Sequence, residues 1–260
     1  IDEFKVIFYW EYFHRLIARF IGLFFLIPLI YFYFTKKIKK KYINICLLIF
    51  FLILLQGIIG WYMVESGLVN VITVSHYRLS IHLSVAFLII SALFWLIKDI
   101  NSKGEKLFFK ISNNNLPFQF LILLIFVQII MGAFVSGLDA GKIYQTWPMM
   151  NGDYFPNDLL LKNVNGLLNF DNHSLVQFYH RNLAYLITLY TLFLVMFIYI
   201  KKLSNLYSSL NILLLFLILQ IVLGIFTLIS GLNIYLASLH QITSVLLVFS
   251  ALNLYYLRAN

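Results

Sequence analysis

Seven apolar runs, each as long as a membrane-spanning helix, constrain this chain more than any other feature of its sequence. A helix that crosses the hydrocarbon core of a bilayer needs about 20 mostly apolar residues. Inside that core every backbone N–H and C=O must be paired within the protein, so such a run folds as a helix. The runs cover residues 9–34, 43–64, 76–97, 117–137, 176–200, 211–231 and 235–257. They predict an all-α membrane protein with seven visible transmembrane helices.

The composition indicates the same class. Hydrophobic residues make up 62% of the 260 residues, charged residues make up 11%, and the mean hydropathy is +0.90, which is too apolar for a soluble globular domain. Cys46 is the only cysteine, so this chain alone can build neither a disulfide nor a cysteine-based metal site. The net charge of +9 follows the membrane topology, so it indicates a lipid bilayer rather than a nucleic-acid partner.

The basic residues determine the topology. Twelve of the 19 Lys and Arg residues follow the first, third, fifth and seventh runs: Lys36, Lys37, Lys39, Lys40, Lys41, Lys98, Lys103, Lys106, Lys110, Lys201, Lys202 and Arg258. The positive-inside rule places these ends in the bacterial cytoplasm or the mitochondrial matrix. We therefore expect a multi-pass protein of the bacterial inner membrane or the mitochondrial inner membrane. Residues 138–175 then form a long outer loop, whose aromatic content favours a lid over a site.

Three consecutive runs repeat later in the same order and direction. Gln56 and Gly60 in the second run match Gln220 and Gly224 in the sixth, at an offset of 164. The histidines pair in the same way, His14 with His180 at an offset of 166 and His82 with His240 at an offset of 158. A tandem repeat in one orientation is related by an axis along the membrane normal. It predicts two pseudo-symmetric four-helix bundles in tandem.

The predicted domains follow from the repeat. Residues 1–110 form an N-terminal bundle, and residues 111–260 form a C-terminal bundle with the outer loop 138–175. The fourth run, with Gln128 and Gly132, has no counterpart ahead of the first run. If each unit has four helices, we expect a further helix and its outer loop, the first of eight, ahead of Ile1.

The four paired histidines lie at similar depths. Counted from the cytoplasmic ends of their runs, they lie roughly 24 to 31 Å up the helix, in the outer third of the membrane, toward the periplasmic or intermembrane side. Two histidines on non-adjacent helices of one bundle can grip a heme iron from both faces. A helix-to-helix hydrogen bond explains a single membrane histidine, but not four in a repeat. Zinc fits less well, because two histidines leave a tetrahedral ion short of ligands.

Two further histidines, His76 and His173, have no repeat partner, and we interpret them as interfacial or loop residues. Several arginines lie near the paired histidines and suit the propionates of a heme, namely Arg15, Arg78 and Arg181.

The two halves differ in their ionisable residues. Glu11, three residues before His14, is matched by Gln177, and Arg78, four residues before His82, is matched by Leu236. Chemistry needs groups that transfer protons and stabilise charge, whereas a permanent electron-carrying heme needs mainly ligands and a dry pocket. We infer that the first half holds the reacting site and the second half a permanent heme.

The chain resembles the heme A synthase family in motifs that cover nearly its whole length. They are Glu-Phe-Lys-x-Ile-Phe-x-Trp-Glu-Tyr-x-His-Arg at 3–15, Gly-Trp-Tyr-Met-Val-x-Ser-Gly-Leu at 60–68, Tyr-Arg-Leu-x-x-His-Leu at 77–83, Thr-Trp-Pro-x-Met-x-Gly at 146–152, His-Arg at 180–181 and His-Gln at 240–241. The first helix and outer loop of the family have no match here. Between 138 and 175 the chain is similar to the cysteine-free type.

The resemblance implies eight helices in two bundles, and oxidation of the ring methyl of heme O to a formyl group, giving heme A for terminal oxidases. By motif, His14 and His82 hold the substrate heme beside the acid Glu11, and His180 and His240 ligate heme B. We expect an electron donor such as a ferredoxin, contact with a heme O synthase, and a homo-oligomer. The inserted oxygen comes from dioxygen, as in a monooxygenase, or from water.

Two other functions remain open at this point. A di-heme electron-transfer protein of cytochrome b type, acting on quinone, would hold fixed hemes in both bundles and form no heme product. A transporter would bind its substrate without heme.

Overall fold

The computed structural model describes residues 2–65, 74–102, 106, 110–159 and 164–259. Within these ranges seven helices are long and apolar enough to cross a membrane. They are α1 (Asp2–Thr35), α2 (Lys40–Glu65), α3 (His76–Asn101), α4 (Leu116–Gly137), α5 (His173–Ile200), α6 (Tyr207–Ile229) and α7 (Ile234–Arg258). Each corresponds to one predicted run, so the prediction of an all-α multi-pass membrane protein is confirmed. The chain divides into two compact units, Ile1–Ser66 and Gly67–Asn260.

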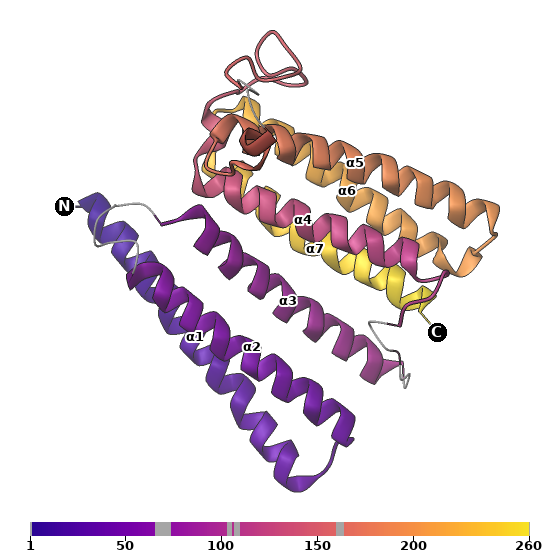
Figure 1. The fold of residues 1–260 in the computed structure, drawn as a ribbon. Coiled ribbons are helices and arrows are strands. Elements are labelled where there is room, and N and C mark those ends of the chain that lie inside the picture. The colour runs from indigo at the N-terminus through magenta and orange to yellow at the C-terminus, as the bar shows by residue number, and fades with distance from the viewer. Residues whose placement is uncertain (1, 66–73, 103–105, 107–109, 160–163, 260) are drawn as a thin grey trace. The chain divides into compact units, whose positions relative to one another are not determined.

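The first unit is a helical hairpin of α1 and α2 (Figure 1). Lys36 takes a left-handed φ of 52° directly after the last residue of α1 and turns the chain. The two helices pack through apolar side chains, such as the stacked rings of Phe25 and Phe50, whose centroids lie 6.4 Å apart. Most other large side chains of this unit are exposed in the structure, as in a helix pair whose apolar surface faces lipid or further helices.

The second unit contains a four-helix bundle. Each of α4, α5, α6 and α7 packs against two of the others, and α3 packs against α4 and α7 (Figure 1). The bundle core contains side chains that are fully buried, among them Leu194 and Ile198 of α5, Leu210 of α6, and Leu252 and Tyr255 of α7. The tandem arrangement of two such bundles and the domain boundary at 110 remain predictions.

Local chemistry explains where the helix ends differ from the apolar runs. α5 begins three residues before its predicted start because Asn172 caps it, its side chain accepting a hydrogen bond from the Leu175 backbone N–H at 3.0 Å. α6 ends at Ile229, before the predicted end at 231, because Gly231 takes a φ of 71°. The backbone N–H of Leu232 then bonds back to the carbonyl of Thr227 at 2.9 Å, which closes the helix end.

A polar network joins the C-terminal ends of α3 and α7. The buried Asp99 accepts a hydrogen bond from the Lys106 backbone N–H at 3.0 Å, and Lys106 Nζ donates to the carbonyl of Tyr256 at 2.9 Å. The Tyr256 hydroxyl also bonds Ser102. Because charged groups are rarely buried unless paired, this network fixes α3 to the bundle at the end opposite the histidines.

Candidate functional site

His180, on α5, faces a glutamine and a glycine of α4. Gln128 and Gly132 lie one helical turn apart and so share a face. Gln128 Nε2 lies 3.3 Å from His180 Nε2 and also donates to the His180 carbonyl at 3.0 Å. A Cβ atom at Gly132 would lie 3.2 Å from His180 Cε1, which is closer than an ordinary carbon contact. The missing side chain at 132 therefore makes room for the imidazole.

His240, on α7, has the same surroundings on α6. Gln220 Nε2 lies 3.2 Å from His240 Nε2, and the Gln220 carbonyl lies 3.1 Å from His240 Nδ1. A Cβ atom at Gly224 would lie 3.0 Å from His240 Cε1. The Gln-x-x-x-Gly spacing noted in the sequence thus builds one histidine cradle on each of two helices.

The two histidines belong to opposite helices of one bundle, and their side chains are close enough to interact electrostatically. Around them, the Oε1 atoms of Gln128 and Gln220 are buried and lack a hydrogen-bond partner among the described residues. Because buried polar atoms are normally paired, these atoms indicate a bound group. Imidazole nitrogens are axial ligands of heme iron, so the residues fit a heme between His180 and His240.

Two residues of α5 close to His180, Gln177 and Arg181, bind the outer loop. The Arg181 guanidinium donates to three backbone carbonyls, those of Tyr144 at 2.8 Å, Thr146 at 2.9 Å and Met149 at 3.3 Å. The buried Gln177, one turn earlier, donates to the Tyr144 carbonyl at 2.9 Å. The loop is thus fixed directly beside the histidine, and binding of a propionate by Arg181 remains a prediction.

A second anchor of the outer loop is Asp158. Its carboxylate accepts hydrogen bonds from the Tyr144 hydroxyl at 2.5 Å and from the Ser174 hydroxyl at 2.6 Å. Burial acts to raise the pKa of the Asp158 carboxyl, but the bonds from Ser174 and Tyr144 outweigh it and hold the pKa below its usual value. Burial, together with the contact to Asp158, raises the pKa of Tyr144. No sequence pattern indicated this cluster.

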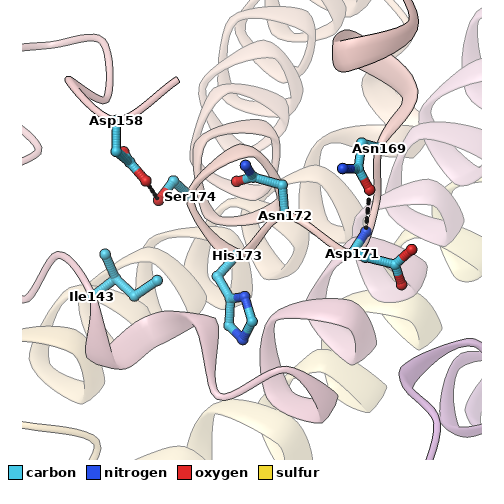
Figure 2. Close-up of a pocket in the computed structure, with 7 residues that line it drawn as sticks. All are labelled: Ile143, Asp158, Asn169, Asp171, Asn172, His173 and Ser174. Carbon is cyan, nitrogen blue, oxygen red and sulfur yellow. Dashed lines mark hydrogen bonds between the residues drawn. The ribbon is translucent and has the colours of Figure 1, made fainter. Parts of the chain in front are cut away.

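A shallow polar cavity of about 320 Å³ opens beside this anchor. It is lined by Ile143, Asp158, Asn169, Asp171, Asn172, His173 and Ser174. Figure 2 shows the carboxylates of Asp158 and Asp171 pointing in different directions, with His173 turned away from both. Within the described ranges no three His, Cys, Asp or Glu side chains come together in a way that would hold a metal ion.

His76 is buried within the protein at the first residue of α3, and its expected interfacial or loop position remains a prediction. Its ring packs edge-on against Phe134 and beside Tyr77, and a Cβ atom at Gly137 would lie only 2.7 Å from its Cβ. His76 Nε2 lies 3.4 Å from Asp171 Oδ1, an ion-pair distance without hydrogen-bond geometry. The contact joins α3 to the outer loop.

The predicted site residues of the first half are divided between the two compact units, so each group is described within its own unit. In the hairpin unit, Glu11, His14 and Arg15 are exposed on α1, and the Glu11 carboxylate pairs with Arg15 Nη2 at 3.5 Å. In the second unit, His82 and Arg78 are half-buried on α3, one turn apart. Their roles remain predictions.

The described chain has seven apolar helices, and one of its bundles carries two imidazoles on opposite helices. These features define a class, the multi-pass membrane proteins with a histidine pair in a helical bundle. Within it, the chain belongs to the cytochrome oxidase assembly protein family, because the family model COX15-CtaA matches residues 1–252. The resemblance found in the motifs is therefore confirmed.

Three relatives, each named heme A synthase, align with nearly the whole chain. That of Pelagibacter ubique (strain HTCC1062) is 50% identical over 262 residues, covering 100% of this chain and 76% of the relative. That of Wolbachia pipientis wMel is 42% identical, covering 99% and 72%. That of Nitrosomonas eutropha (strain DSM 101675 / C91 / Nm57) is 41% identical, covering 97% and 72%. No solved structure matches the chain.

Proposed function

We propose that this protein is a heme A synthase, an oxidoreductase that converts the ring methyl group of heme O to a formyl group through an alcohol. The observation that carries the proposal is the alignment of nearly the whole chain with heme A synthases, at up to 50% identity. The chain also has a repeated set of histidines. The product serves the assembly of cytochrome oxidase, which agrees with the family description.

In this proposal His180 and His240 hold heme B in the second half. When bound, heme B supplies one-electron transfer. The chain contributes the two imidazoles and the glycine faces that make room for them. In the described helices α4–α7 the charged residues are Arg181, next to His180, and Arg258, at the opposite end of α7. The hydrogen bonds of Arg181 to the outer loop support a dry pocket, because they hold the loop on α5 directly beside His180.

The substrate heme O is assigned to the first half, between His14 and His82, with Arg15 and Arg78 as partners for its propionates. The repeat supports this assignment, since these histidines match the pair of the second half. Glu11 is the functional acid of this site. Its counterpart Gln177 is buried and bonded to a loop carbonyl, a structural role that needs no charge, whereas Glu11 is exposed on α1.

The oxidation also needs partners outside the chain. Electrons leave the substrate if water supplies the oxygen atom, and enter with dioxygen if the reaction follows a monooxygenase route, so either route needs an electron carrier such as a ferredoxin. A heme O synthase supplies the substrate. We place the protein in a bacterial inner membrane or the mitochondrial inner membrane, with the histidines on the outer side, and we expect a homo-oligomer.

The test is heme extraction from a bacterial host that makes heme O but no heme A. Membranes with the chain are expected to contain heme A, identified by chromatography and mass. Glu11→Gln, which makes the first half resemble the second, is expected to retain heme O and lose heme A. Fixed heme B in both halves without heme A would refute the proposal and favour an electron-transfer protein. Growth in labelled dioxygen or labelled water identifies the source of the oxygen.

A further inference from the structure

Two aromatic residues of the outer loop lie against the face of α5 that looks away from His180. We propose that Tyr154 and Phe155, here called the aromatic tip, dock into the phospholipid interface of the outer leaflet. The proposal concerns a contact between protein and lipid, and it does not depend on whether the chain binds heme.

The aromatic tip packs on two residues of α5, and Figure 1 shows the outer loop beside this end of the helix. The ring centroids of Tyr154 and Phe155 lie 5.8 Å and 5.2 Å from that of Phe178, both edge-on. The Tyr154 hydroxyl donates to the side-chain carbonyl of Asn182. Phe178 and Asn182 are each two residues from His180, and a helix turns by about 100° per residue, so both point about 160° away from the imidazole.

The same face of α5 continues toward the inner end of the helix as an exposed apolar surface. Leu189, Met196 and Ile200 point within about 20° of the direction opposite His180. They are 64%, 62% and 72% exposed, whereas Ile198, which shares the face of His180, is fully buried. Exposed apolar surface of this extent on a membrane helix faces lipid. The aromatic tip therefore lies at the outer end of a lipid-facing surface.

The depth of the aromatic tip matches the outer boundary of the hydrocarbon core. Lys201 and Lys202 mark the inner end of α5. Asn182 lies about 27 Å above Ile200 along the helix axis, and the hydrocarbon core is about 30 Å thick. Tyr side chains gather at this level, because the ring contacts lipid while the hydroxyl bonds to polar groups. Tyr154 has this arrangement, with its hydroxyl bonded and 49% of the residue exposed.

Asn182 explains why a phenol is placed here. Its amide donates to the Phe178 carbonyl at 2.8 Å, and its own side-chain carbonyl accepts from Tyr154. An amide on a lipid-facing surface needs such partners, because acyl chains offer no hydrogen bonds. Tyr154 thus satisfies the polar group and turns an aromatic ring toward the lipid. The bonds of Arg181 to the carbonyls of Thr146 and Met149 hold the loop on the same helix.

The test uses the full chain in nanodiscs of phosphatidylethanolamine and phosphatidylglycerol, with Cys46→Ser and one nitroxide label. The labelled variants are Phe155→Cys at the tip, Leu189→Cys as the lipid reference and Gly152→Cys as the matched control in the same loop. A Cβ atom at Gly152 would meet no atom within 4 Å among the described residues beyond its chain neighbours, and the residues beside it are exposed and polar. Collisions of the label with oxygen report lipid, and collisions with a nickel chelate report water.

We expect the ratio of oxygen to nickel collisions at Phe155→Cys to shift away from that of Gly152→Cys and toward that of Leu189→Cys. Equal ratios at positions 155 and 152 would place the tip in water and overturn the proposal. Few collisions with either reagent at position 155 would also overturn it, because protein would then cover the tip. Dipolar broadening that disappears on dilution with unlabelled chain would identify that cover as a second copy.

A second measurement serves if Phe155→Cys does not accumulate in membranes. Phe155→Trp keeps an aromatic ring, and brominated phospholipids are expected to quench its fluorescence more than that of Gly152→Trp, each read against the parent chain. Equal quenching would contradict the proposal. Heme content enters neither readout, so a negative result leaves the proposed function untouched, and loss of heme A synthesis would leave the lipid contact untouched.

Discussion

Replacing Gly224 by alanine tests the histidine cradle directly. The new Cβ would lie 3.0 Å from Cε1 and 3.4 Å from Nδ1 of His240. Ordinary carbon contacts are about 3.5–4.0 Å, so the ring must move by about 0.5–1 Å. That movement strains the 3.1 Å contact between His240 Nδ1 and the Gln220 carbonyl. Overpacking typically costs about 1–3 kcal/mol, which corresponds to about 5- to 150-fold weaker binding of a heme that His240 holds.

The assay is heme titration of the purified protein, followed by absorbance, with two further glycine variants. Gly132→Ala places a Cβ at 3.2 Å from His180 Cε1 and is expected to weaken binding by less than Gly224→Ala. Gly57→Ala adds the same methyl group to α2, where the new Cβ would meet no atom within 4 Å among the described residues beyond its own stretch of helix, and is expected to bind heme as wild type does. Equal affinity for Gly224→Ala and Gly57→Ala would refute the cradle.

Three further predictions concern the outer loop. Because the folded pKa of Asp158 lies below its unfolded value of about 3.9, its stabilising contribution is present above that value and is lost as the pH falls through the folded pKa; loop proteolysis should accelerate in acid, and Asp158→Asn should remove that dependence. Arg181→Lys keeps the charge but loses the planar fork, so we expect about 1–3 kcal/mol lower stability, seen as a lower melting temperature; an unchanged value would contradict the clamp. Gln177→Glu removes the donor to the Tyr144 carbonyl and buries a charge, so faster cleavage of the loop is expected, and a wild-type rate would count against it.

The sequence predicted the features that repeat or run over many residues. The seven helices follow from apolar runs, and the presence of His180 and His240 in one half follows from motifs that repeat at similar offsets of 158 to 166 residues. The spacing of Gln128 and Gly132 was visible as a repeat, but its meaning was not. Only the packing of α4 on α5 shows that both residues contact the ring of His180.

The contacts of the outer loop show why other features of the site could not be predicted from the sequence. Arg181 suited a propionate by charge and by its position beside His180, yet its guanidinium binds loop carbonyls more than 30 residues away in sequence. Backbone carbonyls have no signature in a sequence, so such partners cannot be read from it. The contact of His76 with Asp171 is likewise a single long-range contact without a repeat.

In the proposed function, the second half holds a permanent heme B and the first half binds the substrate heme. The most direct measurement is the pigment composition of four purified variants in a host that makes heme O. We expect His180→Ala and His240→Ala to lose heme B and keep heme O, and His14→Ala and His82→Ala to keep heme B and lose heme O. Loss of the same pigment from all four variants would contradict the account.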